Sequence, residues 1–378
     1  MFPQDQESQS AFKKFLAGFI LHLQVKQSAA KTKSNDVFNA FSQSFQGFSK
    51  ICESHIMDGR WAGLVVDLMC KLMIHYALEA DLDSKQNKAE LDKIVEYTSA
   101  HSRLEKVYTQ FQTLFRRMPQ CATTSNAPNN ATYSVFYLSL RMIKIRFKMN
   151  SYKDSESCFK WIDMQFEKEN FNKSDFSISW RVTHAYLQGR LHIYKNELPE
   201  AREKLRFAFE HSHPGYPNNK RKILKFLIPV EMNLYNFPSE QLLTKYSLTE
   251  YLEISQACMK GDMVKFEQAL SQNMDNFVFG GVYMIAERLR HLTLRNLIKK
   301  VALVVKKEPA YQQNGKASIV KLDLIFNILK EWDSQIDLDE IECIIANLIY
   351  MGFIKGYISH EQRLMVLSNI EPFPLRKQ

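Results

Sequence analysis

The chain has 378 residues, of which 45% are hydrophobic and 24% are charged. This is the composition of a folded globular protein with material for about two or three domains. Gly (12) and Pro (11) are scarce, which favours long helices and argues against a turn-rich sheet. The formal net charge of +9 indicates a surface that attracts nucleic acid, acidic protein or anionic membrane, and it specifies no activity.

The first predicted element is an amphipathic helix in the segment "AFKKFLAGFILHLQV". Its large apolar residues fall at helical spacing: Phe12, Phe15, Leu16, Phe19, Ile20 and Leu23. His22 and Gln24 interrupt the apolar run, so we expect a helix that docks on the rest of the fold and not a signal peptide. We find no stretch long enough to span a membrane and expect no membrane insertion.

Helical spacing continues through three further segments. Their apolar faces are Val37, Phe38, Phe41, Phe45 and Phe48; then Leu64, Val65, Leu68, Met69, Leu72 and Met73; then Leu104, Val107, Tyr108, Phe111, Leu114 and Phe115. Segments without helical spacing, at 118–132, 211–219 and 308–317, carry Pro or Gly and are predicted loops. They divide a helical array from the last sixty or so residues.

Residues 186–214 have the pattern of a helical-repeat hairpin. Gly189 takes a small-residue position in the first helix, and Ala201, Leu205 and Ala208 follow in the second, with Pro214 beyond. Small residues at these places let two helices approach closely, as in tetratricopeptide repeats. One hairpin cannot bury its own apolar face, so we expect stacked helical pairs. The segment 251–273 continues the pattern as a helix, a Lys-Gly-Asp turn and another helix.

The C-terminal residues predict a winged helix. We expect Ser318 to cap a helix that carries Ile319, Leu322, Ile325, Phe326 and Leu329 on one side. Asp337 and Glu340 have the spacing of a capping box at the start of a second helix, and Gly352 fits the left-handed position after its end. The segments "FIKGYIS" and "RLMVLS" follow and predict a hairpin.

The charges of this unit argue against insertion into a DNA groove. No basic residue occurs between 331 and 343, where Glu331, Asp333, Asp337, Asp339, Glu340 and Glu342 would repel phosphates. The predicted wing differs, because it carries Lys355 and Arg363.

Stacked helical pairs that run into a winged helix resemble a PCI domain, the module shared by the proteasome lid, the signalosome and an initiation-factor complex. The order of "GRLHIYKNELPEAREKLRFAFEHSHPGYPNNKRKILKFLIPVEMNL", "LLTKYSL", "LRHLTLRNLIKKV", "NLIYMGFIKGYISH" and "PFP" is similar to the PCI-domain-containing protein 2 branch. That branch includes the PCI subunit of the nuclear-pore-associated mRNA-export complex and signalosome-subunit-twelve-like relatives. The resemblance covers residues 180–375 best. We accordingly expect an N-terminal helical region at 1–120, the helical-repeat part of the PCI domain at 133–310, and the winged helix at 311–378.

Basic residues are the candidate nucleic-acid contacts. Between 281 and 307, several stand against Glu287 alone: Arg288, Arg290, Arg295, Lys299, Lys300, Lys306 and Lys307. Lys220, Arg221 and Lys222 form another group, and Lys355 and Arg363 could extend a patch onto the wing. Such residues would bind phosphates independently of sequence. The alternative is a set of solvated helix faces.

Apolar residues of the winged helix are the candidate protein contacts: Tyr350, Met351, Phe353 and Tyr357. Aromatic residues and Met suit an interface, and core packing is the alternative for each of them. The resemblance implies a winged helix paired with that of a Sac/GANP-type scaffold. It also implies a small acidic DSS/Sem-type protein along the helical array.

Motifs of catalysis and of metal binding are absent from the sequence. There is no P-loop, dinucleotide-binding glycine motif, HExxH or GxSxG, and the six cysteines form no Cys-x-x-Cys. Widely spaced cysteines are typical of reduced thiols in the cytosol or nucleus. His211 and His213 lack supporting ligands, so we expect contacts with backbone carbonyls there. We therefore predict no enzyme, no cofactor and no metal.

The leading hypothesis is a non-enzymatic scaffold at the nuclear pore that presents messenger RNA for export, with some of the protein in the cytoplasm. The alternative is a PCI subunit of a proteasome-lid, signalosome-like or initiation-factor assembly, in which the basic surface meets acidic protein.

Overall fold

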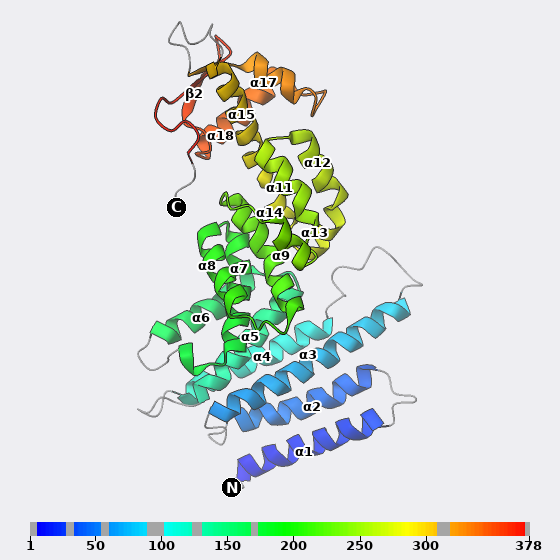
Figure 1. Cartoon of the computed structure of the whole chain (residues 1–378). Coiled ribbons are helices and arrows are strands. Elements are labelled where there is room, and N and C mark those ends of the chain that lie inside the picture. Colours follow the sequence, from blue (N-terminus) through cyan, green and yellow to red (C-terminus); the bar gives the residue numbers. More distant parts are fainter. Residues whose placement is uncertain are drawn as a thin grey trace. The chain divides into compact units, whose positions relative to one another are not determined.

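The computed structural model describes residues 6–27, 34–53, 60–88, 102–122, 131–167, 173–307 and 318–374. These residues are mostly helical and form one small sheet near the C-terminus (Figure 1). The chain divides into two compact units, Met1–Ser177 (unit 1) and Ile178–Gln378 (unit 2). The predicted fold class, an all-α protein with a stacked helical array and a small C-terminal β-wing, is confirmed.

Unit 1 is built from antiparallel helices packed side by side (Figure 1). Its helices are α1 (Gln6–Gln27), α2 (Ser34–Glu53), α3 (Arg60–Lys88), α4 (Ser102–Ala122), α5 (Ala131–Lys148) and α6 (Glu156–Glu167), with 3-10 turns at Lys153–Ser155 and Lys173–Asp175. The predicted loop at 118–132 is shorter than expected, because α4 runs on to Ala122 and α5 begins at Ala131.

The first helix forms as predicted, but a different face is buried. Its contact with α2 uses small residues: a Cβ on Gly18 would lie 2.8 Å from the Ser44 backbone. Because the helices approach this closely, Ala11, Gly18 and His22 occupy the contact. Leu16, Ile20 and Leu23, which were predicted to face the core, are exposed instead.

The third helix also differs from its prediction. Its buried face includes the predicted Met69 and Met73, but also Ala62, Val66, Cys70 and Ala77, whereas Leu64 and Leu68 are exposed. By length and composition alone, Trp61–Asp83 could cross a membrane, so the expectation that no stretch is long enough was wrong. Half of the most apolar window of this stretch is buried inside the protein, as in a core helix.

Unit 2 begins with the predicted hairpin. Its helical part comprises α7 (Ile178–Lys195), α8 (Leu198–His211), α9 (Pro217–Asn233), α10 (Glu240–Lys245), α11 (Glu250–Lys260), α12 (Met263–Gln272), α13 (Met274–Gly280), α14 (Tyr283–Glu287) and α15 (Leu289–Lys307). A Cβ on Gly189 would lie 2.7 Å from Cγ of Leu205, and Ala201 and Ala208 are fully buried. The small-residue contact predicted for α7 and α8 is thereby confirmed.

The Lys-Gly-Asp turn between α11 and α12 is also confirmed. Gly261 ends α11 in the left-handed conformation, with φ of 66°. The Asp262 side chain accepts a hydrogen bond of 3.1 Å from the Lys265 backbone N–H and so caps α12. Helices α11 and α12 both pack on α15, the last helix before the winged helix.

The C-terminal residues form a winged helix with one strand more than predicted. Its elements are β1 (Ile319–Lys321), α17 (Leu322–Leu329), α18 (Leu338–Tyr350), β2 (Gly356–Ser359) and β3 (Leu364–Leu367), with strand order β1-β3-β2. Ile319 therefore lies in a strand, opposite Val366, and not in a helix capped by Ser318. A two-stranded hairpin is marginal alone, and β1 pairs with its open edge.

The second helix of the winged helix matches its predicted ends. The Asp337 carboxylate accepts a 2.7 Å hydrogen bond from the Glu340 backbone N–H, and Gly352 has φ of 75° just after the helix. Ile341, Ile345 and Leu348 are fully buried against Ile325 and Leu329 of α17. The predicted domain limits near 310 cannot be placed, because 308–317 lies outside the described residues, and those at 120 and 133 stay predictions.

Candidate nucleic-acid and partner interfaces

The basic residues between 281 and 307 do not form one exposed patch. Arg290 makes two hydrogen bonds, of 2.7 and 3.2 Å, with the Glu267 carboxylate from α12. Burial alone would lower the pKa of Arg290, but the hydrogen bonds and charge of Glu267 raise it. Arg288 donates to the side-chain oxygen of Asn196. The sequence suggested that this cluster faces Glu287 alone, and the fold brings a second carboxylate to it.

Arg295 is a core residue and is removed from the candidate surface. Its side chain is 3% exposed. It donates a 2.7 Å hydrogen bond to the backbone carbonyl of Phe373, and its guanidinium lies 5.2 Å from the ring centre of Tyr235. Burial lowers the pKa of Arg295. The guanidinium therefore holds the C-terminal residues against α15 and is not available to RNA.

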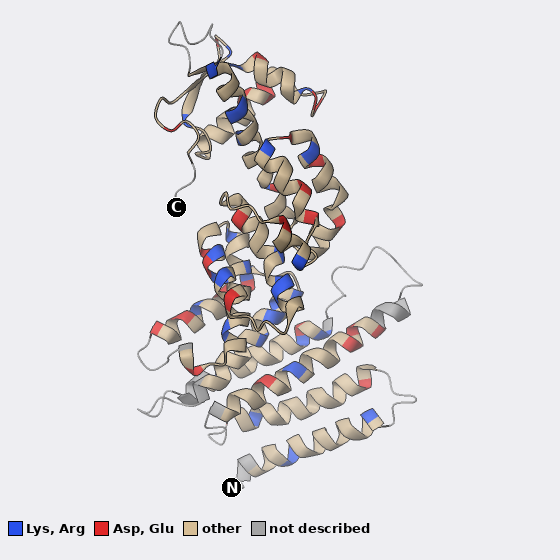
Figure 2. Ribbon diagram, in the orientation of Figure 1, with Lys and Arg blue, Asp and Glu red and all other residues tan. Residues whose placement is uncertain are grey.

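Four lysines on the second half of α15 remain exposed: Lys299, Lys300, Lys306 and Lys307. Leu303 and Val304 lie between them and are 48% and 62% exposed. We name these four lysines the α15 lysines. They stand on the helix that leads into the winged helix, whereas most acidic residues of the winged helix lie on and between α17 and α18 (Figure 2).

The two basic residues of the wing are exposed but not equivalent. The Lys355 ammonium lies 3.4 Å from the Glu371 carboxylate, which offsets its charge. Arg363 has φ of 50° in the β2–β3 turn, and its backbone carbonyl accepts a hydrogen bond from Leu322 N–H. Its side chain is exposed. That the wing extends the surface of the α15 lysines stays a prediction.

The group at 220–222 divides into three different roles. Lys220 donates to the Phe209 carbonyl and lies 4.7 Å from the ring centre of that residue. Arg221 donates to the carbonyls of Tyr246 and Ser247 at the end of α10. Lys222 is exposed and lines a pocket. Of the three, Lys222 stays a predicted phosphate contact.

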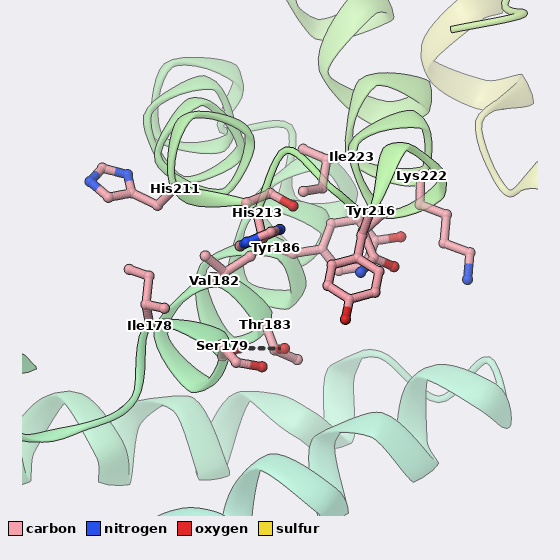
Figure 3. A pocket seen from close by; sticks show the side chains of 12 residues that line it. Ile178, Ser179, Val182, Thr183, Tyr186, His211, His213, Tyr216, Lys222 and Ile223 are labelled. Carbon is pink, nitrogen blue, oxygen red and sulfur yellow. Dashed lines mark hydrogen bonds between the residues drawn. The ribbon is translucent and has the colours of Figure 1, made fainter.

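This pocket has a cavity of about 330 Å³ between α7 and the start of α9 (Figure 3). Its apolar wall includes Ile178, Val182, Tyr186 and Ile223. His211 and His213 point apart in Figure 3. As predicted, His211 contacts a backbone carbonyl, at 3.0 Å from Phe207 O. The same prediction was wrong for His213, whose Nδ1 accepts a 3.0 Å hydrogen bond from the Gly215 backbone N–H. No group of three His, Cys, Asp or Glu suited to a metal ion occurs among the described residues.

The four candidate partner residues differ in how exposed they are. Tyr350 is 91% exposed and Tyr357 63% exposed. Met351 is half-buried against the winged-helix core. Phe353 is itself part of that core, where its ring stacks parallel to His291 at 6.3 Å. Phe353 is therefore withdrawn as a partner contact, because it joins α15 to the winged helix.

Reasoning from the sequence missed two features of this region. Leu303 and Val304 fall on the predicted helix between lysines, but consecutive apolar residues indicate burial as readily as exposure. Glu267 was missed because it lies 23 residues before Arg290, and an ion pair between different helices leaves no local pattern.

Helical repeats that end in a winged helix define the architecture of a PCI protein, and residues 263–369 match the PCI domain model. The chain belongs to the PCI-domain family. It is 31% identical to "PCI domain-containing protein 2" of Xenopus laevis over 94% of this chain and 83% of that protein. It is 32% identical to "Enhanced ethylene response protein 5" of Arabidopsis thaliana, over 89% of this chain and 73% of that protein. It is 28% identical to "Protein CSN12 homolog" of Neurospora crassa, over 83% of this chain and 72% of that protein. The predicted family and branch are confirmed.

Proposed function

We propose that this protein is a non-enzymatic scaffold subunit of a nuclear mRNA-export complex at the nuclear pore. The proposal rests chiefly on the exposure of the α15 lysines beside a winged helix. Exposed cations on one helix suit backbone phosphates of single-stranded RNA and read no sequence. The similarity to PCI domain-containing protein 2 supports a role inside a larger complex. We further propose a Sac/GANP-type scaffold and a small acidic DSS/Sem-type protein as its partners.

Replacing the α15 lysines with glutamate is expected to abolish retention of single-stranded RNA at moderate salt. Each lost phosphate contact lowers the dependence of affinity on salt, by about 0.7 in the logarithmic slope for a single strand. The side chains are exposed, so circular dichroism should not change. The measurement is RNA binding by fluorescence anisotropy over a series of salt concentrations.

The matched control changes Lys160, Lys245, Lys260 and Lys265 to glutamate. These lysines are also exposed but lie on other helices, so the net charge falls by the same amount. If the control weakens RNA binding as much as the α15 variant, the attraction is due to overall charge and the α15 site is wrong.

Tyr350 and Tyr357 are the proposed contacts with the scaffold partner. Changing both to alanine is expected to weaken the complex about tenfold or more, because exposed aromatic residues dominate interface energies. Stability of the isolated protein should change by less than about 0.5 kcal/mol. Mass spectrometry of tagged pull-downs, with the Phe279→Ala variant as an equally exposed control, checks this. Unchanged recovery of the scaffold from the double variant would count against the winged-helix contact.

The second candidate function is a subunit of a signalosome-like or related PCI assembly. The similarity to "Protein CSN12 homolog" favours it. The same pull-down separates the two, since signalosome or proteasome-lid subunits in place of a pore-associated scaffold would support this alternative.

A further inference from the structure

Helix α3 of unit 1 carries an apolar surface that the fold does not use. Trp61, Leu64 and Leu68 are 55%, 59% and 55% exposed. The spacing of three and four residues places them on one line along the helix. We name these three residues the α3 seam. Helix α3 packs on α2, α4 and α5 through its other faces, so the seam contributes nothing to the core.

The seam leads directly into a basic cluster. Lys71, one turn beyond Leu68, lies 3.0 Å from Asp67 and is half-exposed. Arg141 of α5 donates to the other oxygen of Asp67 at 2.6 Å. Lys144 is a third cation within reach of the same carboxylate, so one negative charge faces three positive charges.

Burial and the neighbouring charges both act on Lys144. Burial, together with the charges of Arg141 and Lys71, lowers the pKa of Lys144 to about 8. Burial would raise the pKa of Asp67, but its bonds to Arg141 and Lys71 lower it. Asp67 is therefore already ionised, and its charge is shared between Arg141 and Lys71. A second carboxylate placed beside Lys71 and Lys144 would relieve the repulsion among the cations.

We propose that the α3 seam binds an amphipathic helix of a heterologous partner, with apolar residues spaced three and four apart and a carboxylate opposite Lys71. The spacing of Trp61, Leu64 and Leu68 suits a helix that packs along α3, as in a coiled-coil seam. Contiguous exposed apolar residues are typical of interaction sites. This interface lies outside the proposed RNA and winged-helix contacts and does not depend on them.

The charges argue against a second copy of the chain as the occupant. A parallel α3–α3 pair would oppose Lys71 to Lys71. An antiparallel pair centred on the seam would set Lys71 opposite position 58, before the start of α3 at Arg60, so α3 itself would supply no acidic partner to either basic cluster. An acidic helix avoids both arrangements, because it supplies the missing negative charge.

The test uses a synthetic amphipathic peptide of about 20 residues, with Leu at the seam-facing positions and Glu at the flanking ones, and its twin with Lys for Glu. The full chain is titrated into each fluorescently labelled peptide. We expect the acidic peptide to bind, and the Leu64→Ser/Leu68→Ser variant to bind it at least tenfold more weakly. Met164→Ser, an equally exposed change on α6, should have no effect.

The Lys71→Glu variant distinguishes a docked helix from general adhesion. It should weaken binding of the acidic peptide and strengthen binding of its basic twin. Equal affinity of the wild type and the Leu64→Ser/Leu68→Ser variant for the acidic peptide would overturn the proposal. So would a wild-type dimer in sedimentation that Leu68→Ser dissociates, since a second copy would then be the occupant. Flotation with anionic vesicles that is lost in the same variant would likewise replace the helix with a membrane.

Discussion

Replacing Gly261 with alanine is expected to lower the free energy of unfolding of unit 2 by about 3 kcal/mol or more. The residue follows α11 with φ of 66°, and a side chain in this conformation costs about 1–2 kcal/mol. A Cβ would also lie 2.5 Å from the Leu297 backbone nitrogen and 2.9 Å from the Asn296 carbonyl carbon. Because both atoms belong to the backbone of α15, no side-chain rotation can relieve the overlap.

The displacement would reach the winged helix through α15. The Asn296 side chain donates a 2.8 Å hydrogen bond to the Cys258 carbonyl, so the end of α11 is fixed to this part of α15. Moving the two helices apart breaks this bond and loosens the packing of Met263 on the winged-helix core. The lower free energy of unfolding is measured by urea unfolding followed by circular dichroism.

Gly352→Ala is the matched control. Gly352 also follows a helix with positive φ, 75°, but nothing lies within 4 Å of the position of its Cβ. Only the conformational cost applies, so the expected loss is about 1 kcal/mol. If both variants lost the same free energy of unfolding, the close approach of α11 to α15 would not contribute to the cost of Gly261→Ala.

Local pattern was enough to predict the turn at Gly261 and the hairpin at Gly189. Gly189 is required by the approach of the next helix, and Gly261 by its own left-handed backbone at the end of α11. Both requirements can be read from the position of the glycine in the sequence. The capping of α18 by Asp337 is similar, because a cap involves a donor three residues on. Features of this range made the fold class predictable, whereas the family was predicted from the resemblance of longer stretches of sequence.

Features that depend on distant partners were not predictable. Ile319 has helical spacing with Leu322, but β3 offers it an open edge more than 40 residues later, opposite Val366. The faces of α1 and α3 were misassigned for the same reason: small residues such as Gly18 allow close packing, so larger neighbours are left outside. Periodicity shows that a helix has an apolar side but does not show which of two apolar sides is covered.

Replacing Arg295 with alanine is expected to lower the free energy of unfolding by about 3 kcal/mol. The change removes the hydrogen bond to the Phe373 carbonyl and the contacts with the rings of Tyr235 and Phe373, and it leaves a cavity beside α15. Arg295→Met fills much of that volume without a buried charge, so we expect a loss of only about 1 kcal/mol. Thermal unfolding of both variants by calorimetry provides the measurement.

Measuring RNA binding as well as unfolding distinguishes cations of α15 that stabilise the fold from cations that bind RNA. Since Arg295 is buried, Arg295→Met should bind single-stranded RNA as the wild type does at temperatures where both are folded. Lys299→Glu/Lys300→Glu should show the reverse, with weaker RNA binding and unchanged unfolding, because both side chains are exposed one turn further along α15. If Arg295→Met lost RNA binding while it kept its unfolding temperature, the guanidinium would have to reach solvent, contrary to its contacts with Phe373 and Tyr235. The buried arginine and the exposed lysines of α15 can therefore be told apart by two measurements that respond in opposite ways.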